Sequence, residues 1–256
     1  MKTIIDELHS EFGKIHAKFR TVSIIHLKEL QTEINKWKRN GLFNEKFFKQ
    51  YLSGFSFKPS ITFPNACSII IIGVPQKIIP VNFFYKGKQY QTVLPPTYVY
   101  SEIRTNCKEI LFRVLGNNGY FIDRAILPLK LLAVKSGLAK YGKNNICYVD
   151  GMGSLTRLEA FYTDYEFPSD YWHEKQLMKS CSTCSLCQNA CVTHCIQKER
   201  VLIHADHCLT YLNEDAGDFP LWVSKQSHNA LVGCMHCQII CPQNKNFLQL
   251  LFLSFL

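Results

Sequence analysis

The stretch Cys181-Ser182-Thr183-Cys184-Ser185-Leu186-Cys187-Gln188-Asn189-Ala190-Cys191 places four cysteines in a C-x2-C-x2-C-x3-C spacing. A second group follows, in which Cys208 stands alone and Cys234-x2-Cys237-x3-Cys241 ends in Pro242. A cluster of four irons and four sulfides is a compact box, so its thiolate ligands must converge on it from several directions. A C-x2-C-x2-C loop wraps three thiolates around one box, and in two-cluster ferredoxins the next cysteine ligates the neighbouring cluster. The spacing therefore predicts two [4Fe–4S] clusters.

This crossed pattern assigns all eight cysteines, four to each cluster. The first predicted set is Cys181, Cys184, Cys187 and Cys241. The second predicted set is Cys191, Cys208, Cys234 and Cys237. Zinc is the competing interpretation, because C-x2-C pairs also build zinc sites. Zinc pairs stand about 12–20 residues apart and have no use for a third cysteine three positions further on, so the triple spacing favours iron–sulfur.

Further potential ligands lie among these eight cysteines. Cys195 closely follows Cys191, and we interpret it as either a small buried residue or a ninth thiol near the cluster. Four histidines are interpreted as hydrogen-bond donors or surface residues, since eight thiolates are already available: His194, His204, His207 and His236. Val192 replaces the proline that usually follows the fourth cysteine, which should cost local rigidity rather than a ligand.

Composition and charge limit the compartment and the partners. The 256 residues are 47% hydrophobic, enough for a real core, and twelve are cysteines. No signal-like segment opens the chain, and no apolar run reaches the roughly 18–20 residues of a membrane span. We therefore expect a cytoplasmic protein that is not in a membrane and uses cysteine for metal rather than disulfides. Residues 171–256 hold six Lys/Arg and six Asp/Glu, so the net charge of +9 lies in residues 1–170. This surplus fits an anionic partner such as RNA, and equally a basic solvated face.

Upstream of the cysteines, the patterns indicate mixed helices and strands. The expected helices are residues 3–20, residues 24–39, a short one opened by Asn44, residues 98–116 and residues 125–136. The expected strands are residues 67–74, 145–149 and 158–162, the first being β-branched, ended by Pro75 and typical of burial on both faces. We predict an α/β domain over residues 1–170. Pro168-Ser169-Asp170 would link it to a ferredoxin-like double-cluster domain over residues 171–256.

Three segments of the cysteine-rich part resemble the cluster domain of the epoxyqueuosine reductase family: residues 191–196, 208–214 and 233–244. Upstream, Leu132-Ala133-Val134-Lys135-Ser136-Gly137-Leu138-Ala139-Lys140-Tyr141-Gly142-Lys143-Asn144 is similar to that family's A-x-x-A-G-L-G-x-x-G-K-x segment. Further on, Thr163-Asp164 is similar to the family's T-D dipeptide. The resemblance covers roughly residues 60–245. The Gly151-x-Gly153 turn lacks a third glycine and a following helix, so we reject a dinucleotide site and expect a tight turn beside the cofactor pocket.

The resemblance implies a cobalamin-dependent reductase whose N-terminal domain binds the corrinoid and is reductive-dehalogenase-like. Two clusters would pass electrons, received from a ferredoxin or flavodoxin, to that corrinoid, and the leading substrate is epoxyqueuosine in tRNA, giving queuosine. It also implies that Gly137, Leu138, Gly142 and Lys143 bind the cofactor. Asp123 would be the acid that protonates the departing oxygen, which requires burial to raise the pKa of its carboxyl. From the residues alone, Asp123 could instead cap the helix expected after it.

Three departures from the family weaken the transfer of its full function: the early end of the sequence, a displaced proline and the apolar residues 247–256. The sequence ends soon after the second cysteine group, so we expect a short form without the C-terminal helical-repeat extension that helps hold tRNA. Ile126 stands where the family has a proline. The alternative function is a ferredoxin-type electron carrier without a corrinoid, although a carrier has no need of a 170-residue α/β domain. Residues 247–256 are apolar and are expected to pack on the α/β domain or to mediate self-association.

Overall fold

The chain forms two compact units in a computed structural model that describes residues 3–99, 102–198 and 202–252. The first unit comprises Met1–Pro75, Ser101–Lys140 and Arg157–Gln176. The second comprises Gln76–Tyr100, Tyr141–Thr156 and Leu177–Leu256. Helices and strands alternate through the chain, so the structure is mixed α/β, as predicted.

These units differ from the predicted boundary at residue 170. Segments 76–100 and 141–156 fold with the cysteine-rich segment rather than with the rest of the N-terminal part. The reason is packing at long range in sequence, since Ile78 and Leu155 share a small apolar core with Met235 and Leu248. The cysteine-rich segment is thus supported by two upstream pieces of chain. The assignment of residues 1–170 to cofactor and substrate binding stays a prediction.

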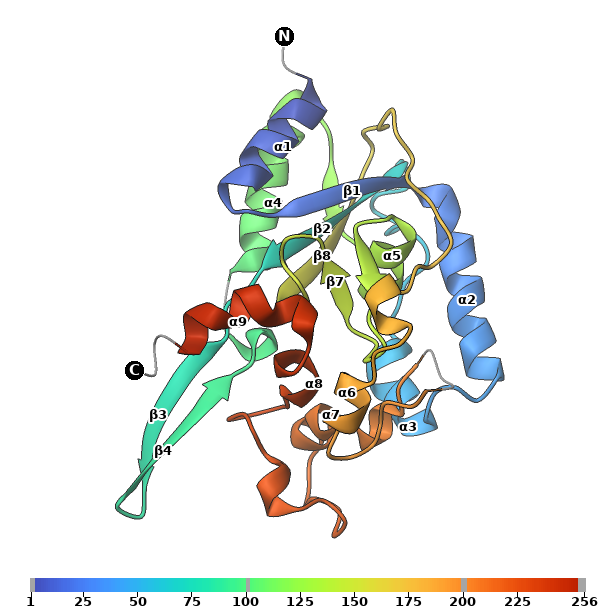
Figure 1. The fold of residues 1–256 in the computed structure, drawn as a ribbon. Helices are drawn as coiled ribbons and strands as arrows, with labels where there is room; N and C mark the ends of the chain where they lie inside the picture. Colours follow the sequence, from blue (N-terminus) through green and yellow to red (C-terminus); the bar gives the residue numbers. More distant parts are fainter. Residues whose placement is uncertain (1–2, 100–101, 199–201, 253–256) are drawn as a thin grey trace. The chain divides into compact units, whose positions relative to one another are not determined.

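The elements are labelled in chain order in Figure 1. The helices are α1 Ile4–Lys14, α2 Leu27–Arg39, α3 Glu45–Phe47, α4 Ile103–Val114, α5 Leu129–Lys135, α6 Leu186–Asn189, α7 Leu209–Glu214, α8 His236–Ile239 and α9 Lys245–Phe252. The strands are β1 Lys18–Ser23, β2 Ser68–Pro75, β3 Ile79–Tyr85, β4 Lys88–Leu94, β5 Ile122–Arg124, β6 Ala139–Tyr141, β7 Cys147–Val149 and β8 Thr156–Thr163.

The first unit is built on a four-stranded sheet in the order β1-β2-β8-β5. Strand β1 runs antiparallel to β2, and β5 runs antiparallel to β8. Residues Ile69–Ile72 of β2 are fully buried, which confirms the strand that its β-branched run predicts. Helices α1 and α4 lie side by side in Figure 1, and their buried faces form one core with alternate residues of the sheet.

The N-terminal helix is shorter than predicted. Residues 18–20 belong to strand β1 rather than to a helix of residues 3–20, because α1 ends at Lys14 and His16 takes a left-handed backbone with φ 55°. Phe19 and Thr21 of β1, two residues apart, are then buried on the same face of the sheet, and the pairing with β2 overrides the helical periodicity. The helix expected over residues 125–136 begins only at Leu129, after Pro128 at its N-cap.

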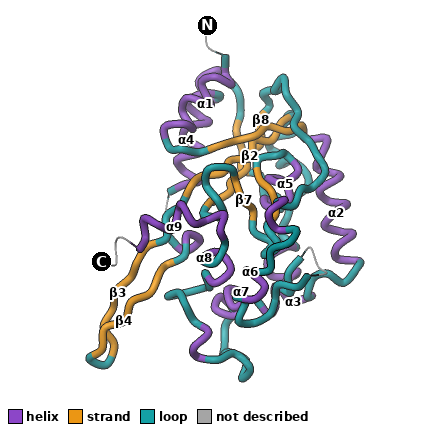
Figure 2. Tube along the Cα trace, viewed as in Figure 1, coloured by secondary structure: helices purple, strands orange, loops and turns teal. Residues whose placement is uncertain are grey.

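The second unit contains little regular structure around its cysteines. In Figure 2 the chain after residue 177 is mostly loop, broken by the short helices α6, α7 and α8. Strands β3 and β4 form a separate two-stranded hairpin that the sequence patterns did not predict. None of the described helices is long and apolar enough to cross a membrane. The apolar tail forms α9 up to Phe252, and residues 253–256 lie outside the described residues.

Candidate metal centre

The first cysteine set gathers around one pocket of the second unit. Cys181, Cys184 and Cys187 line it together with Cys241, which comes from the far end of the cysteine-rich segment. The remaining lining residues are Lys143, Asn144, Tyr148, Leu186 and Pro242. The structure therefore brings together the four cysteines that the crossed pattern assigns to one cluster. Four sulfur donors around a shared hollow fit the thiolate chemistry of a four-iron cluster.

Short turns aim these cysteines at the pocket. Cys181 ends a 3-10 turn in which its backbone N–H donates to the carbonyl of Met178 at 2.9 Å. Cys187 lies in the single helical turn of α6. The ammonium of Lys143 donates to the carbonyl of Cys184 at 2.6 Å, which holds the loop between Cys181 and Cys187 in place. Lys143 also places a positive charge beside a site where thiolates must accumulate.

The second cysteine set also converges. Cys191, Cys208 and Cys237 share a small cluster with Cys195, Ile196 and Ile203, and Cys187 of the first set also packs against it. Burial raises the pKa of the Cys234 thiol, and the charges of the nearby Cys208 and Cys191 add to this effect. No three His, Cys, Asp or Glu side chains among the described residues converge tightly enough to hold a single metal ion. One zinc ion draws its thiolates to about 2.3 Å from a single centre, whereas a cubane cluster holds them at its corners.

Crowding and hydrogen bonds set the acidity of these thiols. Burial, and then the neighbouring cysteines, raise the pKa of Cys187 to about 11, and burial raises that of Cys234 to about 11. Hydrogen bonds from Cys195 instead lower the pKa of Cys191 to about 5 and that of Cys208 to about 6. Because iron binds thiolates, loading both sets must release protons.

Cys195 satisfies both interpretations that its sequence position allows. It is 3% exposed, and its Sγ lies 3.4 Å from the Sγ of Cys191. It also hydrogen-bonds to Cys208. Among the histidines, His236 hydrogen-bonds through Nε2 to the carbonyl of Ser227 at 3.0 Å, as expected of a structural residue.

Two polar residues that the sequence patterns missed contact a cysteine of each set. Asn144 donates from Nδ2 to the hydroxyl of Tyr148 at 3.1 Å. Asn144 also hydrogen-bonds to Cys237 of the second set. Tyr148 hydrogen-bonds to Cys241 of the first set, and its burial, with that bond, raises the pKa of its hydroxyl far above the ordinary value. Their neighbour Lys143 carries the only sequence signal, because it belongs to the glycine-lysine segment that is predicted to bind the cofactor.

The Gly151-x-Gly153 turn supports the second cysteine motif. The backbone N–H of Ser154 donates to Oδ1 of Asn244 at 2.8 Å, and Nδ2 of Asn244 donates to the carbonyl of Gln238 at 2.8 Å. A Cβ on Gly153 would stand 2.3 Å from Oδ1 of Asn244, and its φ of +60° already favours glycine. The turn therefore lies against the residues just after Cys241.

Asp123 lies in the first unit, in strand β5, paired with Tyr162 of β8. It does not cap a helix, because α5 begins six residues later. Its half-buried carboxylate accepts the backbone N–H of Arg124 at 2.8 Å. Burial, and then the negative charge of Asp123, raise the pKa of the Tyr162 hydroxyl to about 12. The two residues are thus neighbours across the β5–β8 pair.

The four residues predicted to hold a corrinoid divide between the units. Gly137 and Leu138 belong to the first unit, whereas Gly142 and Lys143 belong to the second. Gly137 follows the C-cap of α5 with φ +71°, the left-handed conformation that glycine commonly takes just after a helix. A Cβ on Gly142 would stand 2.5 Å from the ring of Tyr148, so that glycine serves the cysteine pocket. Local packing and backbone conformation account for both glycines. Leu138 is buried, and Lys143 hydrogen-bonds to the carbonyl of Cys184 in the first cysteine set. Their binding of a corrinoid stays a prediction.

Known proteins share the cysteine-rich segment and much of the remaining sequence. Residues 180–244 match the family model of the 4Fe-4S double cluster binding domain. The chain is 34% identical to the epoxyqueuosine reductase of Vibrio cholerae over 134 residues, covering 51% of this chain and 35% of that protein. It is 25% identical to the enzyme of Francisella cf. novicida over 236 residues, covering 85% and 64%. The chain resembles the epoxyqueuosine reductases, as its sequence predicts.

The solved structures show the same fold. A selenomethionine-labelled epoxyqueuosine reductase superposes with a TM-score of 0.72 at 19% identity, over 94% of this chain and 66% of that one. An epoxyqueuosine reductase with an epoxyqueuosine-modified tRNA-Tyr stem loop superposes with a TM-score of 0.68 at 19% identity, over 94% and 65%. The chain spans about one third to two thirds of the length of the curated relatives described above.

Proposed function

We propose that this chain is an iron–sulfur reductase that holds one [4Fe–4S] cluster on each cysteine set. The observation that carries the proposal is the convergence of the eight cysteines in the two groups that their spacing predicts. A metal-organised segment of this kind moves single electrons. The large first unit supports an enzyme over a carrier, because electron transfer alone does not need it.

The leading substrate is epoxyqueuosine in tRNA. The relatives bear the name of that reaction, and one of them is solved with an epoxyqueuosine-modified tRNA stem loop. Removing the epoxide oxygen as water consumes two electrons and two protons, and the two clusters supply the electrons one at a time. A ferredoxin or flavodoxin would reload the clusters. An enzyme that acts on tRNA works in the cytoplasm, which is the location we propose.

Cobalamin is the proposed cofactor, and its support is the resemblance of residues 132–144 to the family segment. A corrinoid supplies a strongly reducing metal centre when bound. The chain's own contribution is a proton, for which Asp123 is the candidate. Its half-buried carboxyl accepts the backbone N–H of Arg124, and the residue pairs with Tyr162 of the neighbouring strand. A structure of the Bacillus subtilis relative is described with its catalytic aspartate loop swung out of the active site, which supports an aspartate in this role.

A cobalamin titration of the anaerobically reconstituted full chain tests the cofactor. We expect micromolar binding, seen as a change in the corrinoid spectrum, and turnover of epoxyqueuosine tRNA with a chemical reductant. Asp123→Asn should abolish turnover and leave cluster absorbance and corrinoid binding intact. Asp218→Asn, at an exposed position of the second unit, is the matched control and should keep full turnover.

The carrier hypothesis gives the opposite result. If both clusters form and reduce reversibly, but no corrinoid binds and no tRNA is turned over, the reductase proposal fails. Unchanged turnover in Asp123→Asn would remove that residue from the mechanism while leaving the reductase intact.

A further inference from the structure

The β3–β4 hairpin exposes aromatic rings that its own unit does not cover. All residues from Asn82 to Gln91 are exposed. Phe84 is 76% exposed and Tyr85 is 56% exposed, and Phe83 and Tyr90 are also among the exposed large side chains. Exposed aromatic rings gathered on one element mark an interaction site, because water is a poor environment for them.

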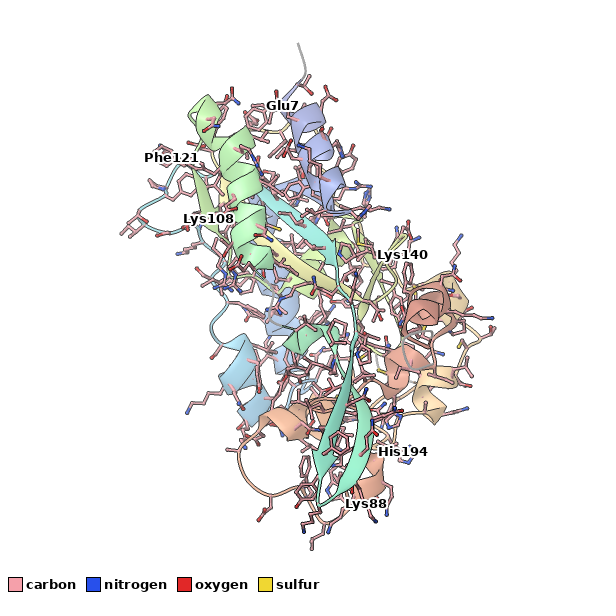
Figure 3. All side chains as sticks on the ribbon, turned by 90° about the vertical axis from the view of Figure 1, so that its left-hand side faces the viewer. Glu7, Lys88, Lys108, Phe121, Lys140 and His194 are labelled. Atoms are coloured by element: carbon pink, nitrogen blue, oxygen red, sulfur yellow. The ribbon has the colours of Figure 1, made fainter. Side chains whose placement is uncertain are left out.

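The backbone of the hairpin is built to hold a fixed shape. Tyr85 pairs with Lys88, so the loop between the strands has only two residues. Lys86 and Gly87 both take positive φ, 48° and 74°, as the tightest hairpin turn requires. Figure 3 shows Lys88 beside this turn. A rigid ribbon of this kind loses little freedom when a partner binds.

Three aromatic rings share one face of the hairpin. Alternation along β3 and the register with β4 put Phe83, Tyr85 and Tyr90 on the same side, together with Lys88. The rings of Phe83 and Tyr90 stack with centroids 5.4 Å apart and planes 16° apart. The opposite side carries Phe84. The hairpin therefore offers flat apolar surfaces on both faces.

Positive charge and amide groups surround these rings. The sequence has no acidic residue from Cys67 to Ser101, whereas Lys77, Lys86 and Lys88 lie in this stretch and are exposed. The ammonium of Lys86 lies 5.2 Å from the ring centre of Tyr85. Three exposed amide side chains, which can pair with base edges, complete the set: Asn82, Gln89 and Gln91.

The base of the hairpin is anchored to the second cysteine motif. The carbonyl of Val93 accepts the backbone N–H of Leu231 at 2.8 Å. Val93 also packs on the core that contains Met235, which lies between Cys234 and Cys237 in sequence. The exposed rings thus belong to an arm whose base is held beside the second cysteine set.

We propose that the β3–β4 hairpin is an RNA-binding arm whose aromatic rings stack on unpaired bases and whose lysines contact the adjoining phosphates. Stacking on aromatic side chains beside a basic surface is the general way in which proteins hold single-stranded RNA. A second copy of the chain is the poorer occupant, since its arm carries the same positive charge. An acidic protein would use the lysines but not the amides. This inference rests on the proposed function for its choice of RNA as the partner, but its test does not require turnover.

The test measures binding of a fluorescently labelled, unmodified RNA stem-loop to the reconstituted full chain by fluorescence anisotropy, with a fully paired RNA duplex for comparison. The double variant Phe84→Ala and Tyr85→Ala should weaken stem-loop binding by about tenfold or more. The double variant Lys86→Ala and Lys88→Ala should reduce the slope of log K against log salt by about 1.4. Tyr85→Phe should bind as the wild type does.

The matched control removes an exposed ring and an exposed lysine from α4, through Phe112→Ala and Lys108→Ala, and should leave binding unchanged (Figure 3 labels Lys108). Cluster absorbance must be equal in all variants, which shows that they fold. Equal stem-loop affinity in the hairpin variants and the wild type would overturn the proposal, as would a selective loss of ferredoxin binding or a change of oligomeric state with RNA binding intact.

Failure of the arm and failure of the proposed function give different results. Turnover of tRNA with unchanged affinity in the hairpin variants refutes the arm alone. Hairpin-dependent stem-loop binding without any turnover supports the arm and refutes the reductase.

Discussion

Asn144 donates a hydrogen bond from Nδ2 to the hydroxyl of Tyr148 at 3.1 Å, and each of the two residues also hydrogen-bonds to a cysteine of a different set. Asn144 contacts Cys237, and Tyr148 contacts Cys241. This pair therefore touches both candidate cluster sites through neutral donors. Hydrogen bonds to ligand sulfurs stabilise the reduced, more negative state of a cluster.

We predict that Asn144→Ala lowers the reduction potential of the cluster on the second set. One lost hydrogen bond of about 0.5–1.5 kcal/mol corresponds to about 20–60 mV for a one-electron couple. Tyr148→Phe should lower the potential of the cluster on the first set in the same way. A redox titration followed by electron paramagnetic resonance measures both shifts. A shift of both clusters by the same amount in each variant would contradict the pairwise contacts.

From the contacts of the Cys195 thiol we predict a second change in reduction potential, confined to the cluster on the second set. Because Cys195 hydrogen-bonds to Cys191 and Cys208, Cys195→Ala should make this cluster harder to reduce by tens of millivolts, on the order of one hydrogen bond. Cys195→Ser keeps a donor and should lie closer to the wild type. Cys107→Ser, at a buried cysteine of the first unit, is the control. Loss of iron in Cys195→Ala would instead make Cys195 a ligand.

The Gly153 turn predicts a loss of stability. Gly153→Ala combines a positive φ with a clash against Asn244. Backbone strain alone costs roughly 1–3 kcal/mol of unfolding free energy, and the clash should add to this cost and lower the thermal unfolding temperature further. Gly41→Ala has the same backbone strain, with φ +65°, and no atom within 4 Å of the added Cβ. Calorimetry of the cluster-loaded protein compares the two, and equal destabilisation would show that the contact with Asn244 does not matter.

The Tyr162 hydroxyl predicts a pH dependence in the first unit. Burial raises its pKa to about 12, with a further contribution from the charge of Asp123, so the fold favours the protonated phenol. Its contribution to stability is present below about pH 10, the ordinary tyrosine pKa, and is lost as the pH rises toward 12. Asp123→Asn should lower this pKa, since it removes a negative charge. Nuclear magnetic resonance of labelled tyrosine, with the Tyr162 signal assigned through Tyr162→Phe, measures this pKa. An unchanged pKa in Asp123→Asn would show that the charge of Asp123 does not act on the Tyr162 hydroxyl.

The grouping of the cysteines could be predicted from sequence because ligand spacing is local. A C-x2-C-x2-C loop constrains three sulfurs within seven residues, and the pattern of two-cluster ferredoxins assigns the fourth cysteine of the run to the other cluster. The strand at Ile69–Ile72 was predicted for a similar reason, since a β-branched run without polar residues fits burial on both faces.

The parts that the sequence did not predict depend on contacts between distant segments. The first residues of strand β1 were predicted as helix, and only their pairing with β2 makes them a strand. The β3–β4 hairpin was not predicted, because its aromatic residues face water and give no buried pattern. Asn144 and Tyr148 carry no motif of their own, and only the folded chain places them against Cys237 and Cys241. The same holds for Gly153, where a side chain would clash with Asn244. Asn244 lies ninety residues after Ser154, the residue to which it hydrogen-bonds.

The central claim is that two clusters sit on two separate sets of four cysteines, and a count of iron and acid-labile sulfide in the anaerobically reconstituted chain tests it most directly. The wild type should hold about eight irons and eight sulfides. Cys184→Ser and Cys234→Ser should each hold about four, with Mössbauer spectra that assign the surviving cluster to the opposite set. About four irons in the wild type, zinc in place of iron, or loss of both clusters in both variants would contradict the claim.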